Sequence, residues 1–283
     1  MIIYTCLTNN YLPLHCDLPE GPLYVVFGIQ DPPKPWVGGS IQDLGCPIRS
    51  SRVPKIKSPF TQPNVYVDAS KLHTINEDFI KLSEDILSKD DLFIMQHPHQ
   101  HSYLEECAEY ICRGLCTEEE VIRITEEASA AGYNFSKYFS PLCTVLWRKG
   151  TEHELNEAWW KWYELGGKRD QLAFSIALQQ TNTKYTYDYS RDVINIWSDA
   201  NPENGEWWKN KGGRYGKKEE VDPISTVDKL SKITKLNKKF RYRAAILREP
   251  DKDPMWMFGD RSDYFRKNYP HLEMISGTYK GWR

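Results

Sequence analysis

The sequence predicts an α/β protein whose mostly parallel, mixed sheet is covered by helices on both faces. Short apolar segments that end in polar turns alternate along the chain with longer segments of helical periodicity, and this alternation is typical of such sheets. Of the 283 residues, 40% are hydrophobic and 27% are charged, and the formal net charge is −2, as in an ordinary globular protein. The chain has no apolar run of about 18 residues and no signal peptide, so we expect a cytoplasmic protein without a membrane segment.

Several segments rich in β-branched and aromatic residues are expected to form strands. They are residues 2–8, 23–28, 65–68, 91–96 and 142–148. Apolar residues at helical spacing predict helices over residues 76–88, 103–113, 117–131, 151–165 and 172–180. The periodicity fades from about residue 190. We therefore expect a core domain over residues 1–190, followed by a less regular extension over residues 191–283.

The expected strand 65–68 ends in a carboxylate, Asp68, which Ala69 and Ser70 follow. Open α/β sheets place their chemistry at the carboxyl ends of their strands, so Asp68 is a candidate site residue. The alternative is that Asp68 caps the helix that follows it, with Ser70 as a second capping residue.

Two further segments place charged residues at distinctive positions. Residues 49–55 form a compact basic turn with three cations, in which Arg52 and Lys55 would share one face if the turn is helical. The alternative is a solvated surface turn. Asp170 and Gln171 follow a glycine pair at the expected start of a helix. There the alternative is that Asp170 is an N-cap, and both interpretations can hold together.

The cysteines and histidines give little support for a metal or disulfide framework. The seven cysteines are scattered and form no CxxC pair, which argues against both a disulfide scaffold and a zinc site. His97, His99 and His101 would share one face of a strand, but Pro98 favours a turn. A metallohydrolase built on these imidazoles is the weakest hypothesis, because they have no carboxylate partner at ligand spacing.

Charge is distributed unevenly along the chain. Residues 209–248 contain 13 Lys or Arg against 4 Asp or Glu, although the whole chain has a net charge of −2. Trp207 and Trp208 precede this segment, and Arg241 and Arg243 lie within it on either side of a tyrosine. Basic residues interleaved with aromatic ones suit the phosphates and flat bases of a nucleic acid.

The basic segment and the aromatic segment 159–163 each have a purely structural alternative. In the basic segment, the alternative is an amphipathic helix. Its solvated face would be Lys229, Lys232 and residues 235–239, and its apolar side Leu230, Ile233 and Leu236. The aromatic segment 159–163 is either core filler or a surface on which a sugar ring stacks.

Several motifs occur in an order that resembles a known pattern. They are Tyr4–Tyr11, Arg49–Lys55, Val65–Ser70, His97-Pro98 with Tyr103 and Glu105-Glu106, and Arg169–Phe174. Together these motifs resemble a family of glycosyltransferase-like domains of unknown function. Through the aspartate turn and the Asp170-Gln171 pair they are also similar to the glycogenin and galactosyltransferase-like enzymes. The resemblance covers residues 1 to about 180.

The resemblance implies a Rossmann-like, type-A glycosyltransferase fold with the donor site in residues 1–190. In such enzymes the first strand and its loop hold the nucleoside, and a basic turn meets the diphosphate. A strand-end carboxylate turn carries ribose and metal, and an Asp at a later helix start faces sugar and acceptor. The donor-binding residues would then be Thr5, Thr8, Asn9, Arg52, Lys55, Asp68, Ala69, Ser70 and Gln171. The catalytic residues would be Asp170 and Asp68.

The residue chemistry fits this assignment, with one departure. A diphosphate leaving group gains negative charge as the glycosidic bond breaks, so cations such as Arg52 and Lys55 are needed beside it. The related enzymes have an Asp-x-Asp turn, but here Ser70 replaces the second carboxylate, and serine is a poor ligand for Mn²⁺ or Mg²⁺. A divalent cation would need Asp68, the diphosphate and a histidine such as His97 or His271. His271 opens a segment with a faint similarity to the closing tail of the glycogenin-like enzymes.

The leading hypothesis is a glycosyltransferase that uses a nucleotide-sugar donor, most plausibly UDP-linked, with a slight preference for a retaining outcome from the resemblance. The acceptor-side residues would be Trp207, Trp208, Arg241 and Arg243 in residues 191–283. Their charge suggests a hydroxymethylated base in DNA as acceptor, as in bacteriophage-type DNA modification, or else a glycan. The alternative function is a non-catalytic nucleic-acid or carbohydrate binding protein.

Overall fold

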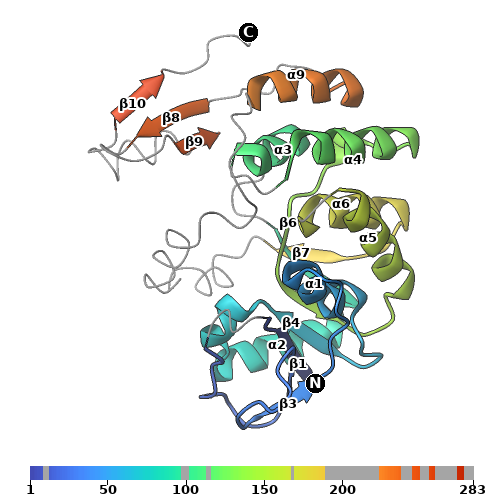
Figure 1. Ribbon diagram of the computed structural model, residues 1–283. Helices are drawn as coiled ribbons and strands as arrows, with labels where there is room; N and C mark the ends of the chain where they lie inside the picture. Colours follow the sequence, from blue (N-terminus) through green and yellow to red (C-terminus); the bar gives the residue numbers. More distant parts are fainter. Residues whose placement is uncertain are drawn as a thin grey trace. The chain divides into compact units, whose positions relative to one another are not determined.

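The computed structural model describes residues 1–8, 13–96, 102–112, 116–166, 169–188, 223–236, 244–248, 255–258 and 273–276 (Figure 1). The chain divides into two compact units. Unit 1 consists of Met1–Gln100, Ser140–Glu164 and Lys168–Asn210, and unit 2 of His101–Phe139, Leu165–Gly167 and Lys211–Arg283. Residues 101–139 thus group with the C-terminal part of the chain. The expected boundary at residue 190 lies outside the described residues and stays a prediction.

Within the described ranges, unit 1 is built on a seven-stranded sheet with the order β3-β2-β1-β4-β6-β5-β7. The strands are β1 (Ile2–Cys6), β2 (Leu23–Phe27), β3 (Trp36–Gly39), β4 (Asn64–Val67), β5 (Leu92–Gln96), β6 (Pro141–Arg148) and β7 (Thr186–Asp188). Strand β6 runs antiparallel to β4 and β5, and all other neighbouring pairs are parallel. The predicted mostly parallel, mixed sheet is thus confirmed.

The two edge strands, β3 and β7, were not predicted from the sequence. All three residues of β7 are exposed, so this strand has no apolar alternation to reveal it. Strand β3 ends in two glycines, which have low strand propensity. A Cβ at Gly39 would lie 2.6 Å from the Phe27 ring, so the glycine allows β3 to pack closely on β2.

The basic turn expected at residues 49–55 is instead part of helix α1 (Pro47–Lys57). Pro47 lies in the first turn, where its missing N–H leaves no hydrogen bond unmade and its fixed φ suits a helix start. Pro54 lies inside the helix, near its C-terminal end, and lacks the N–H that would donate to the carbonyl four residues earlier. The helix places Arg52 and Lys55 on one face, as their spacing of three residues requires.

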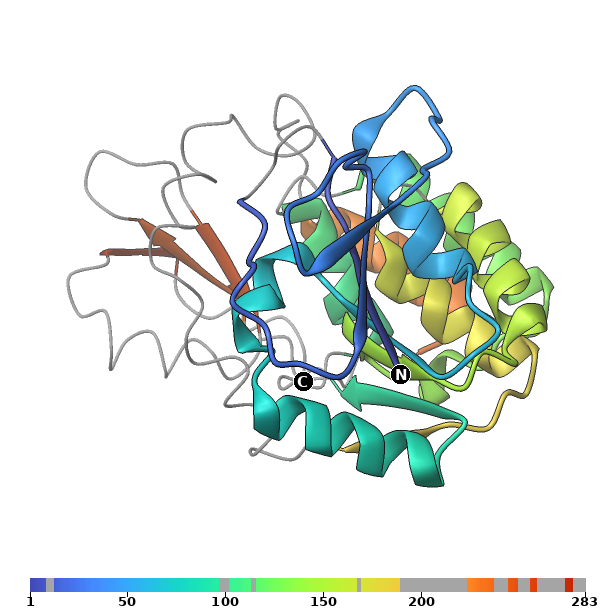
Figure 2. The same cartoon turned by 90° about the horizontal axis from the view of Figure 1, so that it is seen from below.

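Helices flank the sheet on both faces (Figure 2). Helix α2 (Glu77–Lys89) lies on one side of the strands, preceded by the short 3₁₀ helix η1 (Ala69–Thr74). Helices α1, α5 (His153–Leu165) and α6 (Asp170–Gln180) lie on the other side.

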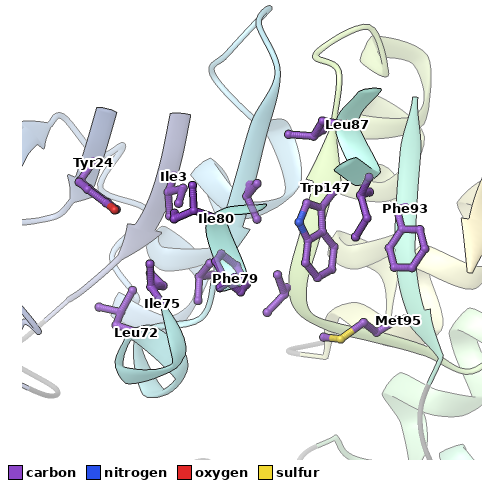
Figure 3. Close-up of a cluster of buried hydrophobic side chains, with 14 of the residues drawn as sticks. Ile3, Tyr24, Leu72, Ile75, Phe79, Ile80, Leu87, Phe93, Met95 and Trp147 are labelled. Atoms are coloured by element: carbon purple, nitrogen blue, oxygen red, sulfur yellow. The ribbon is translucent and has the colours of Figure 1, made fainter. Parts of the chain in front are cut away.

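The face beneath α2 is an apolar core centred on Trp147 (Figure 3). The Trp147 ring meets Phe93 of β5 edge-to-face at 5.4 Å between centroids and Phe79 of α2 at 6.1 Å. Its indole N–H donates to the Ser83 hydroxyl at 2.9 Å, so the single polar atom of this buried ring is satisfied. Burial of this apolar surface contributes to the stability of unit 1.

The opposite face of the sheet buries polar groups. Side chains alternate across a strand, so Tyr4, Tyr66 and Arg148 lie on the face away from α2, because their chain neighbours belong to the apolar core. All three are almost completely buried, and the two tyrosine rings meet edge-to-face at 5.3 Å. Buried polar side chains need partners: Arg148 Nη1 donates to the Tyr4 hydroxyl at 3.2 Å and to the Lys55 carbonyl of α1 at 2.9 Å.

Unit 2 combines helices with a small antiparallel sheet. Its elements are α3 (Tyr103–Cys112), α4 (Glu118–Ala130), the 3₁₀ helix η2 (Phe135–Lys137), α9 (Pro223–Thr234), β8 (Ala244–Arg248), β9 (Met255–Phe258) and β10 (Glu273–Ser276). The three strands have the order β10-β8-β9. None of the helices among the described residues is both long enough and apolar enough to cross a membrane.

Helix α9 confirms the amphipathic interpretation of part of the basic segment. Val227 and Leu230 are buried, and the helix packs against α3 and α4. Lys229 is exposed and its ammonium lies 2.5 Å from a Glu118 carboxylate oxygen in α4. The helix ends at Thr234, before Leu236. In residues 223–234 the lysines therefore form the solvated face of a packed helix.

Candidate functional site

The strand order of unit 1 reverses between β1 and β4. The chain passes from β1 to β2 and β3 on one side, then crosses to β4 on the other, and β1 pairs in parallel with both neighbours. Open α/β sheets bind ligands at such a reversal, outside the carboxyl ends of the strands. Asp68 directly follows β4, so it lies at this reversal.

The Asp68 carboxylate is anchored through one of its two oxygens. Oδ1 accepts a hydrogen bond from the Tyr66 hydroxyl at 2.8 Å and lies 3.4 Å from Lys55 Nζ. In the part of the chain that the structure describes, both contacts of this side chain are made through Oδ1, and the side chain is 24% exposed. Oδ2 takes part in neither of these contacts. The capping alternative is wrong, because the Asp68 side chain makes no cap hydrogen bond to η1.

Lys55 joins Asp68 to a second carboxylate from a distant part of the chain. Its ammonium lies 2.6 Å from Asp170 Oδ2 and 3.4 Å from Asp68 Oδ1, and its side chain is only 2% exposed. The same ammonium lies 5.2 Å from the centroid of the Tyr66 ring. The solvated-turn alternative is wrong for Lys55. The resemblance assigned Lys55 to a donor diphosphate. In the structure its ammonium instead contacts the carboxylates of Asp68 and Asp170.

Asp170 is the first residue of α6, and the N-cap position that the alternative gave it is occupied by Arg169, whose side chain makes no capping hydrogen bond. Arg52 Nε lies 3.7 Å from Asp170 Oδ2. Burial alone would raise the pKa of Asp170, but the charges of Lys55, Arg52 and Arg169 outweigh it and hold the pKa below its ordinary value. The carboxylate therefore stays ionised at neutral pH and is unsuited to act as a general acid.

Two buried side chains hold the backbone of this cluster. The Trp159 indole N–H donates to the Asp170 carbonyl at 2.8 Å, and its ring stacks on Phe174 with 4.0 Å between centroids. Arg148 Nη1 donates to the Lys55 carbonyl at 2.9 Å, and its guanidinium lies 5.6 Å from the Trp159 ring. The core-filler interpretation of Trp159 is thus confirmed, and this core residue positions Asp170.

The structure places Thr5 away from the cluster. Its side chain is fully buried, and Ile3 and Leu7, which share its face of β1, belong to the apolar core beneath α2. Asp68 continues the opposite face, two residues after Tyr66. The Thr5 side chain therefore gives no support to its predicted donor contact.

Other predicted donor residues make structural contacts. The Gln171 amide donates to the Pro141 carbonyl at 3.1 Å and is buried between α6 and β6. The Thr8 hydroxyl donates to the Pro47 carbonyl at 3.3 Å, which connects the end of β1 to the start of α1. Ala69 and Ser70 begin η1 and are half-buried beside Asp68.

Several predicted residues lie outside the described residues, and their assignments stay predictions. They are Asn9, His97, Trp207, Trp208, Arg241, Arg243 and His271.

The sequence analysis missed Tyr66, Lys71 and Arg148. Tyr66 was detectable, because residues two apart on a strand share a face and this one precedes Asp68 by two. Lys71 is 7% exposed in η1, and its N–H donates to the Asp68 carbonyl at 2.7 Å. Burial lowers the pKa of Lys71, and the Asp68 charge opposes that shift. Nothing in the sequence indicated Arg148, whose role depends on the packing of α1.

The described residues do not fit a divalent metal at Asp68. No group of three or more His, Cys, Asp or Glu side chains converges within these ranges. Mg²⁺ and Mn²⁺ prefer several oxygen ligands, whereas Asp68 offers one carboxylate whose Oδ1 is already engaged. The charged groups around it include the ammonium groups of Lys55 and Lys71, which would repel a metal cation.

Comparison with family models, with curated proteins and with solved structures finds no match for this chain. The resemblance of its motifs to glycosyltransferase-like domains therefore remains a hypothesis. The functional argument rests on the geometry of the cluster formed by Arg52, Lys55, Asp68 and Asp170.

We expect Asp170→Asn to lower the free energy of unfolding by about 3–5 kcal/mol. The substitution removes the nearer carboxylate and leaves the buried Lys55 ammonium with Asp68, at 3.4 Å, as its partner. Asp68→Asn should cost less, since that carboxylate is partly exposed. Asp85→Asn, on the exposed surface of α2, is the matched control and should change the free energy by less than about 0.5 kcal/mol. Urea denaturation measures all three. A loss below about 1 kcal/mol for Asp170→Asn would contradict the buried bridge.

The contribution of Asp170 to stability should depend on pH in one direction. Its folded pKa lies below the unfolded value of about 3.9, so the contribution is complete above that value and is lost as pH falls toward the folded pKa. The difference in unfolding free energy between the wild type and Asp170→Asn should stay constant from about pH 8 to about pH 5. It should shrink below about pH 4. A difference that instead grows on acidification would show that the folded pKa is raised.

Proposed function

We propose that this protein is a glycosyltransferase that takes a sugar from a nucleotide-sugar donor and that Asp68 binds the donor. The observation that carries the proposal is the position of Asp68 at the strand-order reversal, where Oδ1 makes both described contacts and the side chain is 24% exposed. The motif order described above points to the same class of enzyme, and the type-A form of the α/β fold is part of this proposal.

The chemistry of a strand-end carboxylate among cations suits a nucleotide-sugar. Asp68 Oδ2 can accept hydrogen bonds from the hydroxyls of a ribose or a sugar. A phosphate would be repelled by Asp68 but attracted by Arg52, whose side chain is 12% exposed. The proposed orientation therefore has the hydroxyl groups of the donor at Asp68 and the diphosphate beside Arg52.

Asp170 has a different role in this proposal from the catalytic one that its motif suggested. Its side chain is 4% exposed and is engaged by Lys55 and Arg52. Because it stays ionised, it holds Lys55 in place and adds negative charge beneath the sugar site, which suits a transition state with positive charge on the sugar carbon. We therefore assign Asp170 as a positioning residue and Asp68 as the donor contact.

The acceptor assignment, DNA with a hydroxymethylated base or else a glycan, remains a prediction from the charge of residues 209–248. The alternative of a non-catalytic nucleic-acid or carbohydrate binding protein stays a second hypothesis. Within the described part of the basic segment, Lys229 is paired with Glu118 and belongs to the packed helix α9.

The donor half of the proposal predicts that UDP raises the melting temperature by about 5–10 °C at a concentration of roughly 100 times its dissociation constant. Asp68→Asn should abolish sugar transfer from a UDP-sugar while its melting temperature without ligand stays close to that of the wild type. Asp85→Asn should retain both properties. If neither UDP nor any other nucleoside diphosphate shifts the melting temperature, the donor assignment is wrong.

A further inference from the structure

The main chain of Asp68 is held on both sides. Its N–H donates to the Thr144 carbonyl at 2.8 Å, which extends the pairing of β4 with β6 by one residue. Its carbonyl accepts a hydrogen bond from the Lys71 N–H at 2.7 Å, at the start of η1. The torsion that rotates an aspartate carboxylate is broad and roughly two-fold, so a fixed main chain does not orient the two oxygens. Their orientation depends on the contacts of the side chain.

Within the described ranges, two groups form a hydrogen bond or an ion pair with the Asp68 carboxylate, and Tyr66 is the nearer. The Tyr66 hydroxyl donates to Oδ1 at 2.8 Å, whereas the Lys55 ammonium lies 3.4 Å from the same oxygen. That second distance is long for an N–H···O hydrogen bond. Lys55 also has a closer partner, because its ammonium lies 2.6 Å from Asp170 Oδ2. The contact that sets the orientation of the Asp68 carboxylate is therefore the one with Tyr66.

Tyr66 is itself fixed by its packing. It precedes Asp68 by two residues, so the two side chains share one face of the strand. The Tyr66 side chain is buried, and its ring meets Tyr4 edge-to-face at 5.3 Å between centroids. The Lys55 ammonium lies 5.2 Å from the centroid of the same ring. A side chain locked in this way presents its hydroxyl at a constant position.

The Tyr66 hydroxyl also keeps the proton that it donates. Burial raises the pKa of Tyr66 well above its ordinary value, and the charge of Asp68 raises it further. The group is therefore a donor across the neutral pH range. Its hydrogen bond is directional, whereas the ammonium of Lys55 is a point charge that attracts either oxygen of a carboxylate.

We propose that Tyr66 is a positioning residue of the donor site, whose hydroxyl holds Asp68 Oδ1 and so fixes the orientation in which the carboxylate meets the donor. The inference rests on the proposed function, in which Asp68 is the donor contact. Tyr66 acts through Asp68, because its own side chain is 2% exposed. A carboxylate that is already oriented need not be ordered when the donor binds, and this increases the affinity for the donor.

The test is isothermal titration calorimetry of UDP-glucose with the full chain. This probe carries the hydroxyls of a ribose and of a sugar, so it reports a contact of Asp68 with either. Tyr66→Phe keeps the ring and removes the hydroxyl. It should bind UDP-glucose about 3- to 10-fold more weakly, because the carboxylate must then be ordered on binding. In an Asp68→Ala background there is no carboxylate to position, and adding Tyr66→Phe should change the dissociation constant by less than about twofold.

Tyr4→Phe is the matched control. Tyr4 is buried on the same face and packs on the Tyr66 ring, but its hydroxyl accepts a hydrogen bond from Arg148 Nη1 at 3.2 Å. This variant loses a buried hydroxyl that has no described contact with Asp68, so its affinity for UDP-glucose should stay within about twofold of the wild type. An equal loss of affinity in Tyr4→Phe and Tyr66→Phe would overturn the positioning role, because it would show a general loosening of this face.

The remaining outcomes separate this inference from the proposed function. Wild-type affinity in Tyr66→Phe would overturn the role of Tyr66 and leave the glycosyltransferase proposal intact. The same loss from Tyr66→Phe in the Asp68→Ala background would also overturn it, since Tyr66 would then act without Asp68. If the wild type binds neither UDP-glucose nor any other nucleoside diphosphate, the proposed function is wrong and this inference with it.

A second variant tests the same claim from the partly exposed side of the contact, in case Tyr66→Phe does not fold. Asp68→Glu keeps the charge but displaces the carboxylate relative to the Tyr66 hydroxyl. It should bind UDP-glucose at least about threefold more weakly, because the charge is present but is no longer held in the same orientation. Wild-type affinity in Asp68→Glu would show that the orientation of the carboxylate is unimportant and would overturn the inference.

Discussion

The candidate site depends on one buried ammonium group. Lys55 is almost inaccessible to water, and its charge is balanced by Asp170 from the start of α6 and by Asp68 from the end of β4. A buried charge without such partners is strongly destabilising, so the contact restricts where α1 and α6 can pack against the sheet. Asp68 Oδ2, which takes part in neither described contact of this carboxylate, is the atom of the cluster that the proposed function assigns to a ligand.

Strand β6 shows how the two faces of the sheet divide their roles. Trp147 and Arg148 are consecutive residues, so their side chains point to opposite faces. Trp147 packs between Phe79 and Phe93 in the apolar core beneath α2 (Figure 3). Arg148 instead binds the Lys55 carbonyl and lies over Trp159, which in turn holds the Asp170 carbonyl. The face beneath α2 is thus an apolar core, and the opposite face holds the charged groups of the candidate site in position.

The sequence predicted much of the site because its key residues occupy local landmarks. A strand end, a helix start and a basic segment identified Asp68, Asp170, Arg52 and Lys55, and the structure brings all four together. The burial of Lys55 could not be predicted, because it depends on α6 packing over α1, a contact between distant segments. The contact of Arg148 with α1 could not be predicted for the same reason. Nor could the division into two units, because it depends on α3 and α4 packing with the distant helix α9. The edge strands were missed because their residues are exposed or are glycines.

The most direct test of the central claim is a double-mutant cycle between Lys55 and Asp170, measured as the free energy of unfolding. Lys55→Met and Asp170→Leu each leave a buried charge without its nearest partner, whereas the double variant removes both charges of the pair. The bridge predicts that the double variant is more stable than the sum of the single losses allows, with a coupling energy of at least about 2 kcal/mol. Losses that add to within about 0.5 kcal/mol would contradict a buried contact between these side chains.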